Sequence, residues 1–207
     1  MKEIRCESIG EAWLKSCEHI SKKGKAVLDG DKKLREVMNL IVSVKKPGQK
    51  DRIIEKYGDK KMIKWMLSNF LEQKNVPELK NAPSYGTRLF NYRGKNQIEW
   101  VIKKLREKPE TKSATISMIM PEDENYIPCV STLDFKIRNG KLGVFAMCRA
   151  IDFGKKVYAN LIALNKIQNI VSEKTGIPSG ELTIFVVSSH IYDEDYDKIK
   201  KILGRKK

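Results

Sequence analysis

The residues best suited to chemistry lie in the second half of the chain. A cysteine, an arginine, an aspartate, an asparagine, a histidine and a tyrosine follow one another, as Cys129, Arg149, Asp152, Asn160, His190 and Tyr192. A cysteine thiolate is a nucleophile, a guanidinium binds phosphate, and the amide, imidazole and phenol groups form hydrogen bonds. Together these groups could attack the pyrimidine ring of a nucleotide while they hold its phosphate.

Cys129 directly precedes a predicted strand, where a cysteine can also be a small buried apolar residue. A catalytic thiol needs a nearby cation to lower its pKa, and Arg149 is the obvious candidate. Alternating apolar residues on both sides of Asn139-Gly140 predict a hairpin with a type I′ turn. In that hairpin Cys129 would face Ala150, one residue from Arg149, so the sequence itself predicts that the thiol and the guanidinium are neighbours.

Each of these residues also has an ordinary structural explanation. Arg149 could lie on the solvent face of its strand or form an ion pair with Asp152. Asn160 could cap a helix, and His190 could be a buried core residue. The order in which the residues occur favours one shared site over these separate explanations.

The elements that must position the site follow from apolar periodicity. Helical spacing predicts helices over residues 10–28, 59–73, 96–107, 157–173 and 193–203. Alternation and apolar runs predict strands over residues 34–44, 114–120, 131–138, 142–148 and 182–188. Two prolines predict a loop over residues 76–86. We therefore expect a single α+β domain over residues 1–207, with a largely antiparallel or mixed sheet and helices packed on it.

Composition narrows the classes of partner. The net charge is +15, from 41 Lys and Arg against 26 Asp and Glu, but the lysines are scattered, which favours a solvated surface over a polynucleotide site. No stretch approaches the roughly 20 apolar residues of a membrane span, and no apolar run follows the N-terminal charges. Four cysteines without a CxxC pair argue against disulfides and zinc, with Cys6 and Cys17 expected in a helical region. We expect a reduced, cytoplasmic protein without a metal.

The motifs from Asn96 to Tyr192 resemble, in order, the catalytic half of the thymidylate synthase family, and residues 84–88 resemble its Tyr-Gly loop. The resemblance is greatest to the short archaeal branch of that family. It implies a thymidylate synthase-like fold and methylation of dUMP at C5 to dTMP, with Cys129 forming a covalent bond to C6. It also implies a one-carbon pterin cosubstrate, of the methylenetetrahydrofolate or methanopterin type.

The resemblance further implies how the nucleotide would be bound. Arg149 would bind the 5′-phosphate and help to keep Cys129 ionised. Asn160 would read the uracil edge through N3 and O4. His190 and Tyr192 would hold the 3′-hydroxyl of the deoxyribose.

Three more residues acquire implied roles. Asp152 would contact the pterin, and Tyr85 would belong to the water network that removes the C5 proton. Lys112 stands where the family has an arginine that serves the phosphate of the partner subunit, which implies a homodimer; a monomer stays open as the alternative, because the phosphate-loop residues of the short archaeal branch have changed.

The chain also departs from the family pattern. Met62 replaces a glutamate three residues before Trp65, and Cys148 and Ala150 flank the phosphate arginine in place of glutamine and serine. The family's N-terminal Arg-Thr-Gly-Thr loop and its folate-covering tail are not seen, so ordinary methylenetetrahydrofolate is expected to work poorly. Two alternatives stay open, namely a pyrimidine nucleotide hydroxymethylase and a non-catalytic nucleotide-binding relative. Met62 favours the second and Cys129 opposes it.

Overall fold

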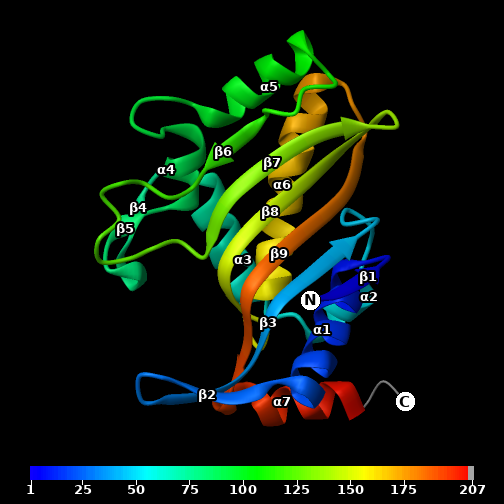
Figure 1. Cartoon of the computed structure of the whole chain (residues 1–207), viewed down its shortest axis with the longest axis vertical. Coiled ribbons are helices and arrows are strands. Elements are labelled where there is room, and N and C mark those ends of the chain that lie inside the picture. The colour runs from blue at the N-terminus through cyan, green and yellow to red at the C-terminus, as the bar shows by residue number, and fades with distance from the viewer. Residues whose placement is uncertain (205–207) are drawn as a thin grey trace.

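The computed structural model describes residues 1–204 and consists of a mixed sheet with helices against one face (Figure 1). Its strands are β1 (Lys2–Cys6), β2 (Lys25–Asp29), β3 (Lys32–Val44), β6 (Thr115–Ser117), β7 (Val130–Arg138), β8 (Lys141–Asp152) and β9 (Ser179–Tyr192). They lie in the order β1-β3-β9-β8-β7-β6, with β2 also paired to β3. The β1–β3 and β8–β9 pairs are parallel and the other pairs are antiparallel. The predicted α+β class and mixed sheet are confirmed; residues 205–207, at the end of the expected domain, lie outside the described residues.

The helices are α1 (Ile9–Lys23), α2 (Arg52–Tyr57), α3 (Lys60–Leu71), α4 (Tyr85–Phe90), α5 (Gln97–Glu107), α6 (Val157–Thr175) and α7 (Asp193–Gly204). A short strand β4 (Asn75–Val76), a 3-10 turn (Pro77–Leu79) and a strand β5 (Ala82–Pro83) separate α3 from α4. Helix α6 lies against the sheet and is buried on most sides, because α3 and α1 cover it from outside. Trp13 of α1 packs on Tyr158 of α6 with ring centroids 4.4 Å apart.

Local signals explain most of these boundaries. The side chain of Asn96 accepts a hydrogen bond from Glu99 N (3.0 Å) and so caps α5. Gly176 ends α6 in the left-handed region at φ 73°. Asn139 and Gly140 have φ values of 51° and 69°, which confirms the type I′ turn between β7 and β8.

Several predictions of the elements were wrong. The first helix ends at Lys23, and residues 25–29 form β2, which pairs with β3 instead of continuing the helix. Cys6 lies in β1, a strand that was not predicted, and pairs with Val44. The expected loop over residues 76–86 contains short paired strands and the start of α4. In each case pairing between distant or very short segments overrides the local pattern.

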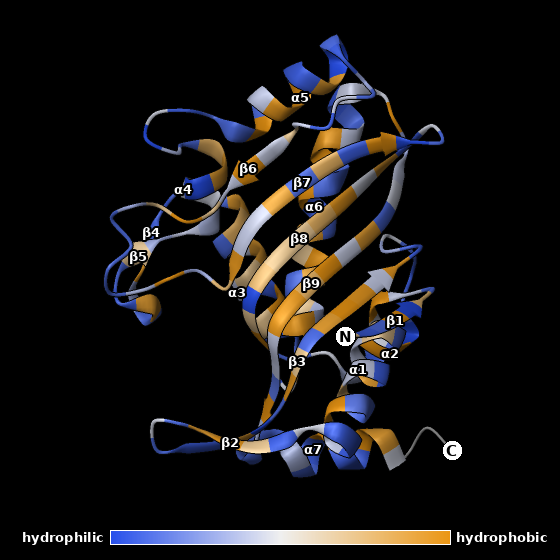
Figure 2. Cartoon of the chain, viewed as in Figure 1, coloured by the Kyte–Doolittle hydropathy of each residue, from blue (hydrophilic) through white to orange (hydrophobic). Residues whose placement is uncertain are grey.

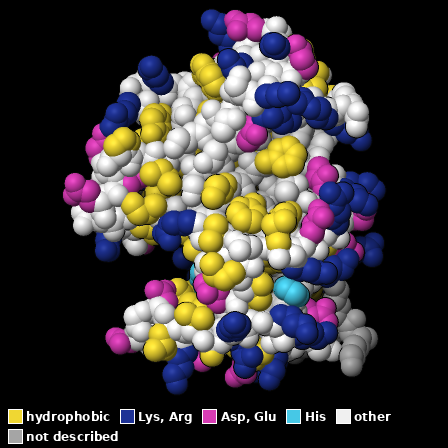
Figure 3. Space-filling view, viewed as in Figure 1, with side chains coloured by type: hydrophobic (Ala, Val, Ile, Leu, Met, Phe, Trp, Pro, Cys, Tyr) yellow, Lys and Arg dark blue, Asp and Glu magenta, His cyan; other side chains and the backbone are white. Residues whose placement is uncertain are grey.

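Within residues 1–204, the other face of the sheet carries no helix. Along much of β3, β8 and β9 buried residues alternate with more exposed ones. Figure 2 shows that these strands are rich in apolar residues. The helix-free face leaves Met38, Phe145 and Met147 about half exposed, at 51%, 45% and 48%. Figure 3 views this open face, on which hydrophobic side chains gather in the middle of the molecule. Such a patch on a protein surface marks a place for contact with another molecule.

Candidate active site

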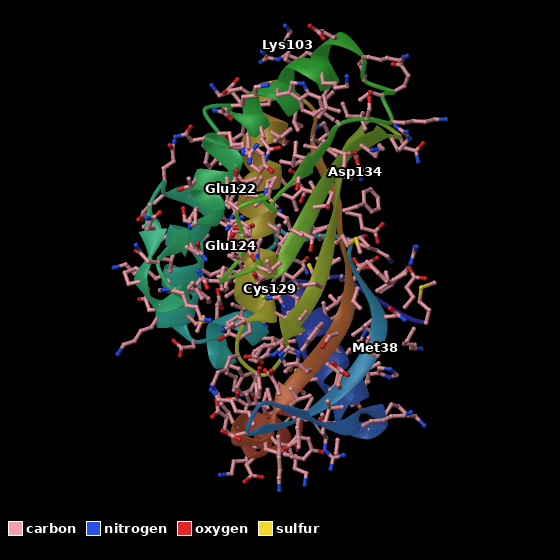
Figure 4. All side chains as sticks on the ribbon, turned by 60° about the vertical axis from the view of Figure 1, so that its left-hand side comes forward. Met38, Lys103, Glu122, Glu124, Cys129 and Asp134 are labelled. Atoms are coloured by element: carbon pink, nitrogen blue, oxygen red, sulfur yellow. The ribbon has the colours of Figure 1, made fainter. Side chains whose placement is uncertain are left out.

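The predicted site residues meet where β8 and β9 end and α6 begins. Asp152 of β8 pairs with His190 of β9, and Phe153 N donates to His190 O (2.8 Å). Asn160 lies in the first turns of α6, which follows β8 after a short turn. Cys129 lies at the nearby end of β7, as Figure 4 shows. Residues from three strands and one helix thus converge at one end of the sheet.

A β-bulge sets the register between Cys129 and its cation. The bulge lies between Val130 and Thr132 and adds one residue to β7. Arg149 N donates to Cys129 O (2.9 Å), so Cys129 faces Arg149. The expected pairing of Cys129 with Ala150 was wrong by one residue, because the hairpin register does not continue through the bulge.

The guanidinium of Arg149 holds the chain just before the thiol. Its Nε donates to Ile127 O and Pro128 O (both 3.2 Å), and its Nη2 donates to Ile127 O (2.6 Å). Burial raises the pKa of the Cys129 thiol, whereas Arg149 and Lys156 act to lower it. Arg149 therefore favours the thiolate as expected, but burial has the larger effect on the pKa of the thiol.

Asp152 and His190 form a buried pair of titratable groups. Asp152 Oδ1 accepts hydrogen bonds from Gly154 N (2.8 Å) and Lys155 N (3.1 Å). Burial raises the pKa of Asp152 and lowers that of His190, while the attraction between the two groups partly offsets both shifts. Asp152 bonds these amides, whereas Arg149 bonds loop carbonyls. Among the ion pairs of residues 1–204 there is therefore none between Arg149 and Asp152, the pair that the sequence left open.

Asn160 is not a helix cap. Helix α6 begins at Val157 after Lys156, so Asn160 lies one turn inside the helix. It is only 5% exposed, and its Nδ2 donates to Lys156 O (3.0 Å). This buried carboxamide near the start of α6 can both donate and accept hydrogen bonds, so it is suited to recognise the polar edge of a bound ligand.

The β2–β3 hairpin contributes groups that the sequence did not predict. Tyr192 donates to Asp29 Oδ2 (2.6 Å), and its ring contacts the His190 ring edge-on at 5.1 Å. Ser188 donates to Glu36 and lies 3.4 Å from His190 Nδ1. The sequence did not predict these acidic partners, because the predicted helix over residues 10–28 covered most of β2 and so hid the hairpin that brings Asp29 and Glu36 to the site.

Two tyrosines border the thiol. Tyr85 is buried, and its hydroxyl accepts a hydrogen bond from Val130 N (2.9 Å); burial raises its pKa well above the usual range. Tyr126, which the sequence analysis missed, has its pKa raised to about 12 by burial, with a further contribution from Cys129. The signal that could have found it is an aromatic residue in an otherwise acidic loop just before Cys129.

One predicted site residue lies apart from the thiol. Thr115 of β6 pairs with Asp134 of β7 in antiparallel fashion, so Lys112 extends toward the Arg138 end of β7, away from Cys129. Lys112 is exposed there. Met62 lies in α3, partly buried against the core.

Neither a metal site nor a membrane-spanning helix occurs among the described residues. No group of three His, Cys, Asp or Glu side chains within residues 1–204 is arranged to hold a metal ion. Within the same residues, no helix combines the length and the apolar character that crossing a membrane requires.

Comparison with known proteins gives a consistent result. The thymidylate synthase family profile matches residues 48–207. A protein of Methanosarcina mazei named “Putative thymidylate synthase” is 33% identical over 206 residues, which cover 97% of this chain and 94% of the relative. A protein of the same name from Methanothermobacter marburgensis is 29% identical over 223 residues, covering 97% of each chain. One from Methanocaldococcus jannaschii is 29% identical over 214 residues, covering 96% of this chain and 94% of the relative.

Proposed function

The chain belongs to the thymidylate synthase family, and we propose that it methylates dUMP at C5 to give dTMP through a covalent bond between Cys129 and C6. One observation carries the proposal. Cys129 lies directly opposite Arg149, at the same end of the sheet as Asp152, His190 and the head of α6. The nucleophile and the phosphate-binding cation therefore lie at the same end of the sheet as groups that can form hydrogen bonds to a base and a sugar.

The Cys129 thiolate attacks C6 of the uracil, which makes C5 nucleophilic toward the one-carbon unit. Because burial raises the pKa of the Cys129 thiol, we infer that ionisation accompanies nucleotide binding and closer approach of a cation. Tyr85 then acts on the C5 proton through water. Its oxygen already accepts from Val130 N, which leaves its own O–H to donate into a water network.

Recognition of dUMP falls to the polar groups around the thiol. Arg149 binds the 5′-phosphate; its Nη1 is not among the atoms that bond the loop carbonyls. Asn160 pairs with N3 and O4 of uracil, since an amide both donates and accepts. His190 and Tyr192 bond the 3′-hydroxyl, and their contact with each other fixes both rings.

Asp152, the site residue that does not contact the nucleotide, fits a one-carbon pterin. The amide donors of Gly154 and Lys155 both bond Asp152 Oδ1, which leaves Oδ2 for an N–H of the pterin ring. When bound, such a pterin supplies the carbon unit and the reducing equivalents that turn it into a methyl group. Met62 in place of the family's glutamate is the reason to compare carriers of the methylenetetrahydrofolate and methanopterin types in parallel assays.

We also propose that the active form is a homodimer joined through the uncovered face of the sheet. Two observations support this. Met38, Phe145 and Met147 are half exposed on that face, and Lys112 lies away from the Cys129 of its own chain. In a dimer Lys112 serves the phosphate of the partner's site.

The direct test is covalent capture of 5-fluoro-dUMP in the presence of pterin, detected by mass spectrometry of the intact protein. The wild type is expected to form the adduct, and Cys129→Ser to lose it while still binding dUMP reversibly in calorimetry. Full adduct formation by the serine variant would exclude Cys129 as the nucleophile.

The product then separates the alternative activities. Tritium release from [5-³H]dUMP with formation of dTMP supports the proposal, whereas a hydroxymethyl nucleotide would identify the hydroxymethylase. Binding of dUMP with neither adduct nor tritium release would identify a non-catalytic relative.

A further inference from the structure

The segment that delivers Cys129 to the site has no regular structure of its own. Residues 119–129 contain no helix or strand and connect β6 to β7. Glu122 and Glu124 are exposed and are labelled on this segment in Figure 4. Such a stretch would place a catalytic thiol poorly unless other elements fixed it.

A buried ion pair fixes the first half of the segment. Arg88 of α4 is fully buried, and its two terminal nitrogens bond both carboxylate oxygens of Asp123, at 2.5 and 2.6 Å. Arg88 Nη1 also donates to Met118 O (2.7 Å), and its Nε donates to Pro83 O (3.1 Å). Asp123 accepts Met120 N as well (2.8 Å), so every charged atom of the pair is engaged.

The same short helix fixes the other end. Tyr85, one turn before Arg88, accepts a hydrogen bond from Val130 N, the residue after the thiol. Gln97 at the start of α5 donates to Arg88 O (2.9 Å) and Ser117 O (2.7 Å), which ties α4 to the strand before the segment. Helix α4 therefore holds the segment at both ends.

Two arginines thus hold the segment that carries Cys129. Arg149 bonds the carbonyls of Ile127 and Pro128, but under the proposed function it also binds the phosphate of the nucleotide. Arg88 lies in the core with no exposed surface, so a ligand cannot draw it away. The burial of a bidentate ion pair is costly unless its geometry is good, and here all of its donors are matched.

We propose that the Arg88–Asp123 pair is a positioning device that keeps Cys129 in place for attack while Arg149 binds substrate. Neither residue touches the nucleotide; both act through the segment 119–129. The consequence for catalysis rests on the proposed function, whereas the consequence for the segment itself does not.

The test compares Asp123→Asn, which keeps the size of the side chain and removes its charge, with Glu122→Gln. Glu122 is the adjacent residue and forms an exposed ion pair with Arg93, with 64% and 54% of the side chains exposed, so it is a matched control. Two quantities are measured, namely the rate of Cys129 alkylation by iodoacetamide and the rate of 5-fluoro-dUMP capture at saturating ligand.

For Asp123→Asn we expect faster alkylation, because a loosened segment exposes the thiol. We also expect a roughly 10–100-fold slower capture, the size of loss that a displaced reacting group produces. The Kd for dUMP should stay near the wild-type value, which separates positioning from general damage. Glu122→Gln should behave like the wild type in all three measurements.

Unchanged alkylation and capture in Asp123→Asn would overturn the proposal, as would equal changes in Glu122→Gln. If the wild type captures no 5-fluoro-dUMP, the proposed function fails, and the alkylation comparison alone still decides whether the pair holds the segment. If Asp123→Asn does not fold, the double variant Arg88→Met with Asp123→Asn, which leaves no lone buried charge, carries the same comparison.

Discussion

Asp152 keeps a carboxyl group in a place where a neutral side chain would be more stable. Its Oδ1 bonds two backbone amides, yet burial raises its pKa above the ordinary 3.8. A raised pKa means that the folded protein binds the proton more tightly than the unfolded chain does. The stabilisation that the protonated form provides is therefore present at low pH and is lost as the pH rises through the folded-state pKa.

Asp152→Asn should accordingly raise the thermal stability at neutral pH while it weakens pterin-dependent turnover. The amide keeps an oxygen for Gly154 N and Lys155 N but carries no charge to desolvate. Each kcal/mol regained would raise the Tm by roughly 2–4 °C in a chain of this size. In thermal scans from pH 3 to 8, the difference in Tm between Asp152→Asn and the wild type should grow as the pH rises.

Asp197 is exposed, so Asp197→Asn is the control. Its Tm should not show a gain over the wild type that grows with pH. A lower Tm for Asp152→Asn at neutral pH would contradict the expectation, because it would mean that the carboxylate stabilises the fold.

Asn160 is the residue expected to choose the base. Asn160→Asp replaces a donor–acceptor pair with acceptors alone, so O4 of uracil would lose its partner. A mispaired buried polar group costs roughly 1–3 kcal/mol, which predicts about 5–150-fold weaker dUMP binding. Calorimetry with dUMP and dCMP would measure the switch.

In the wild type, dUMP should bind more tightly than dCMP by a similar factor, and the aspartate variant should prefer dCMP. Equal affinity of the wild type for both nucleotides would remove Asn160 from the recognition of the base.

At the scale of elements, the sequence predicted best where local signals agree. Helix α6 combines a long apolar run with a closing glycine, and the β7–β8 hairpin combines alternation with Asn139-Gly140. The bulge before Thr132 has no such signal, so the pairing of Cys129 was wrong by one residue. The exposed strand β2 depends on its pairing with β3, which a local pattern does not contain.

The type I′ turn is a direct test of how strongly the hairpin is specified. Gly140 has φ 69°, with no atom within 4 Å of an added Cβ, so Gly140→Ala strains only the backbone. A left-handed alanine costs about 1–2 kcal/mol, and the Tm should fall by roughly 2–8 °C. Differential scanning calorimetry measures the change.

Gly204→Ala has equally open surroundings but no left-handed φ, so its Tm should stay at the wild-type value or rise slightly. A Gly140→Ala variant as stable as the wild type would mean that the turn relaxes to another conformation.

At the scale of the whole molecule, position along the chain says little about which groups share a site. Arg88 and Asp123, far apart in sequence, form the buried pair that holds the start of the segment leading to Cys129. Lys112 is closer in sequence to Cys129 than His190 is, yet the direction of β6 carries it away. Motif order could predict which residues take part in the site, whereas the sheet topology separates Lys112 from the Cys129 of its own chain.

The uncovered face of the sheet is where that second chain is expected to bind. A stable dimer buries roughly 1,200–2,000 Å² in total, and apolar residues at its centre provide most of the stability. Light scattering at micromolar concentration should therefore give twice the 23.8 kDa of one chain for the wild type. The double variant Phe145→Lys and Met147→Lys should give a single chain, because facing charges would be buried.

Trp100→Lys is the matched control, since Trp100 is similarly exposed at 44% but lies on helix α5 and not on the sheet. It should leave the mass of the dimer unchanged.

The shared site is tested by mixing Cys129→Ser chains with Lys112→Ala chains. Each is expected to be poor in 5-fluoro-dUMP capture alone, and the mixture should recover part of it, because mixed dimers combine an intact thiol with an intact lysine from the partner. A wild-type protein with the mass of a single chain, or a mixture that recovers no 5-fluoro-dUMP capture, would show that Lys112 is an ordinary surface residue.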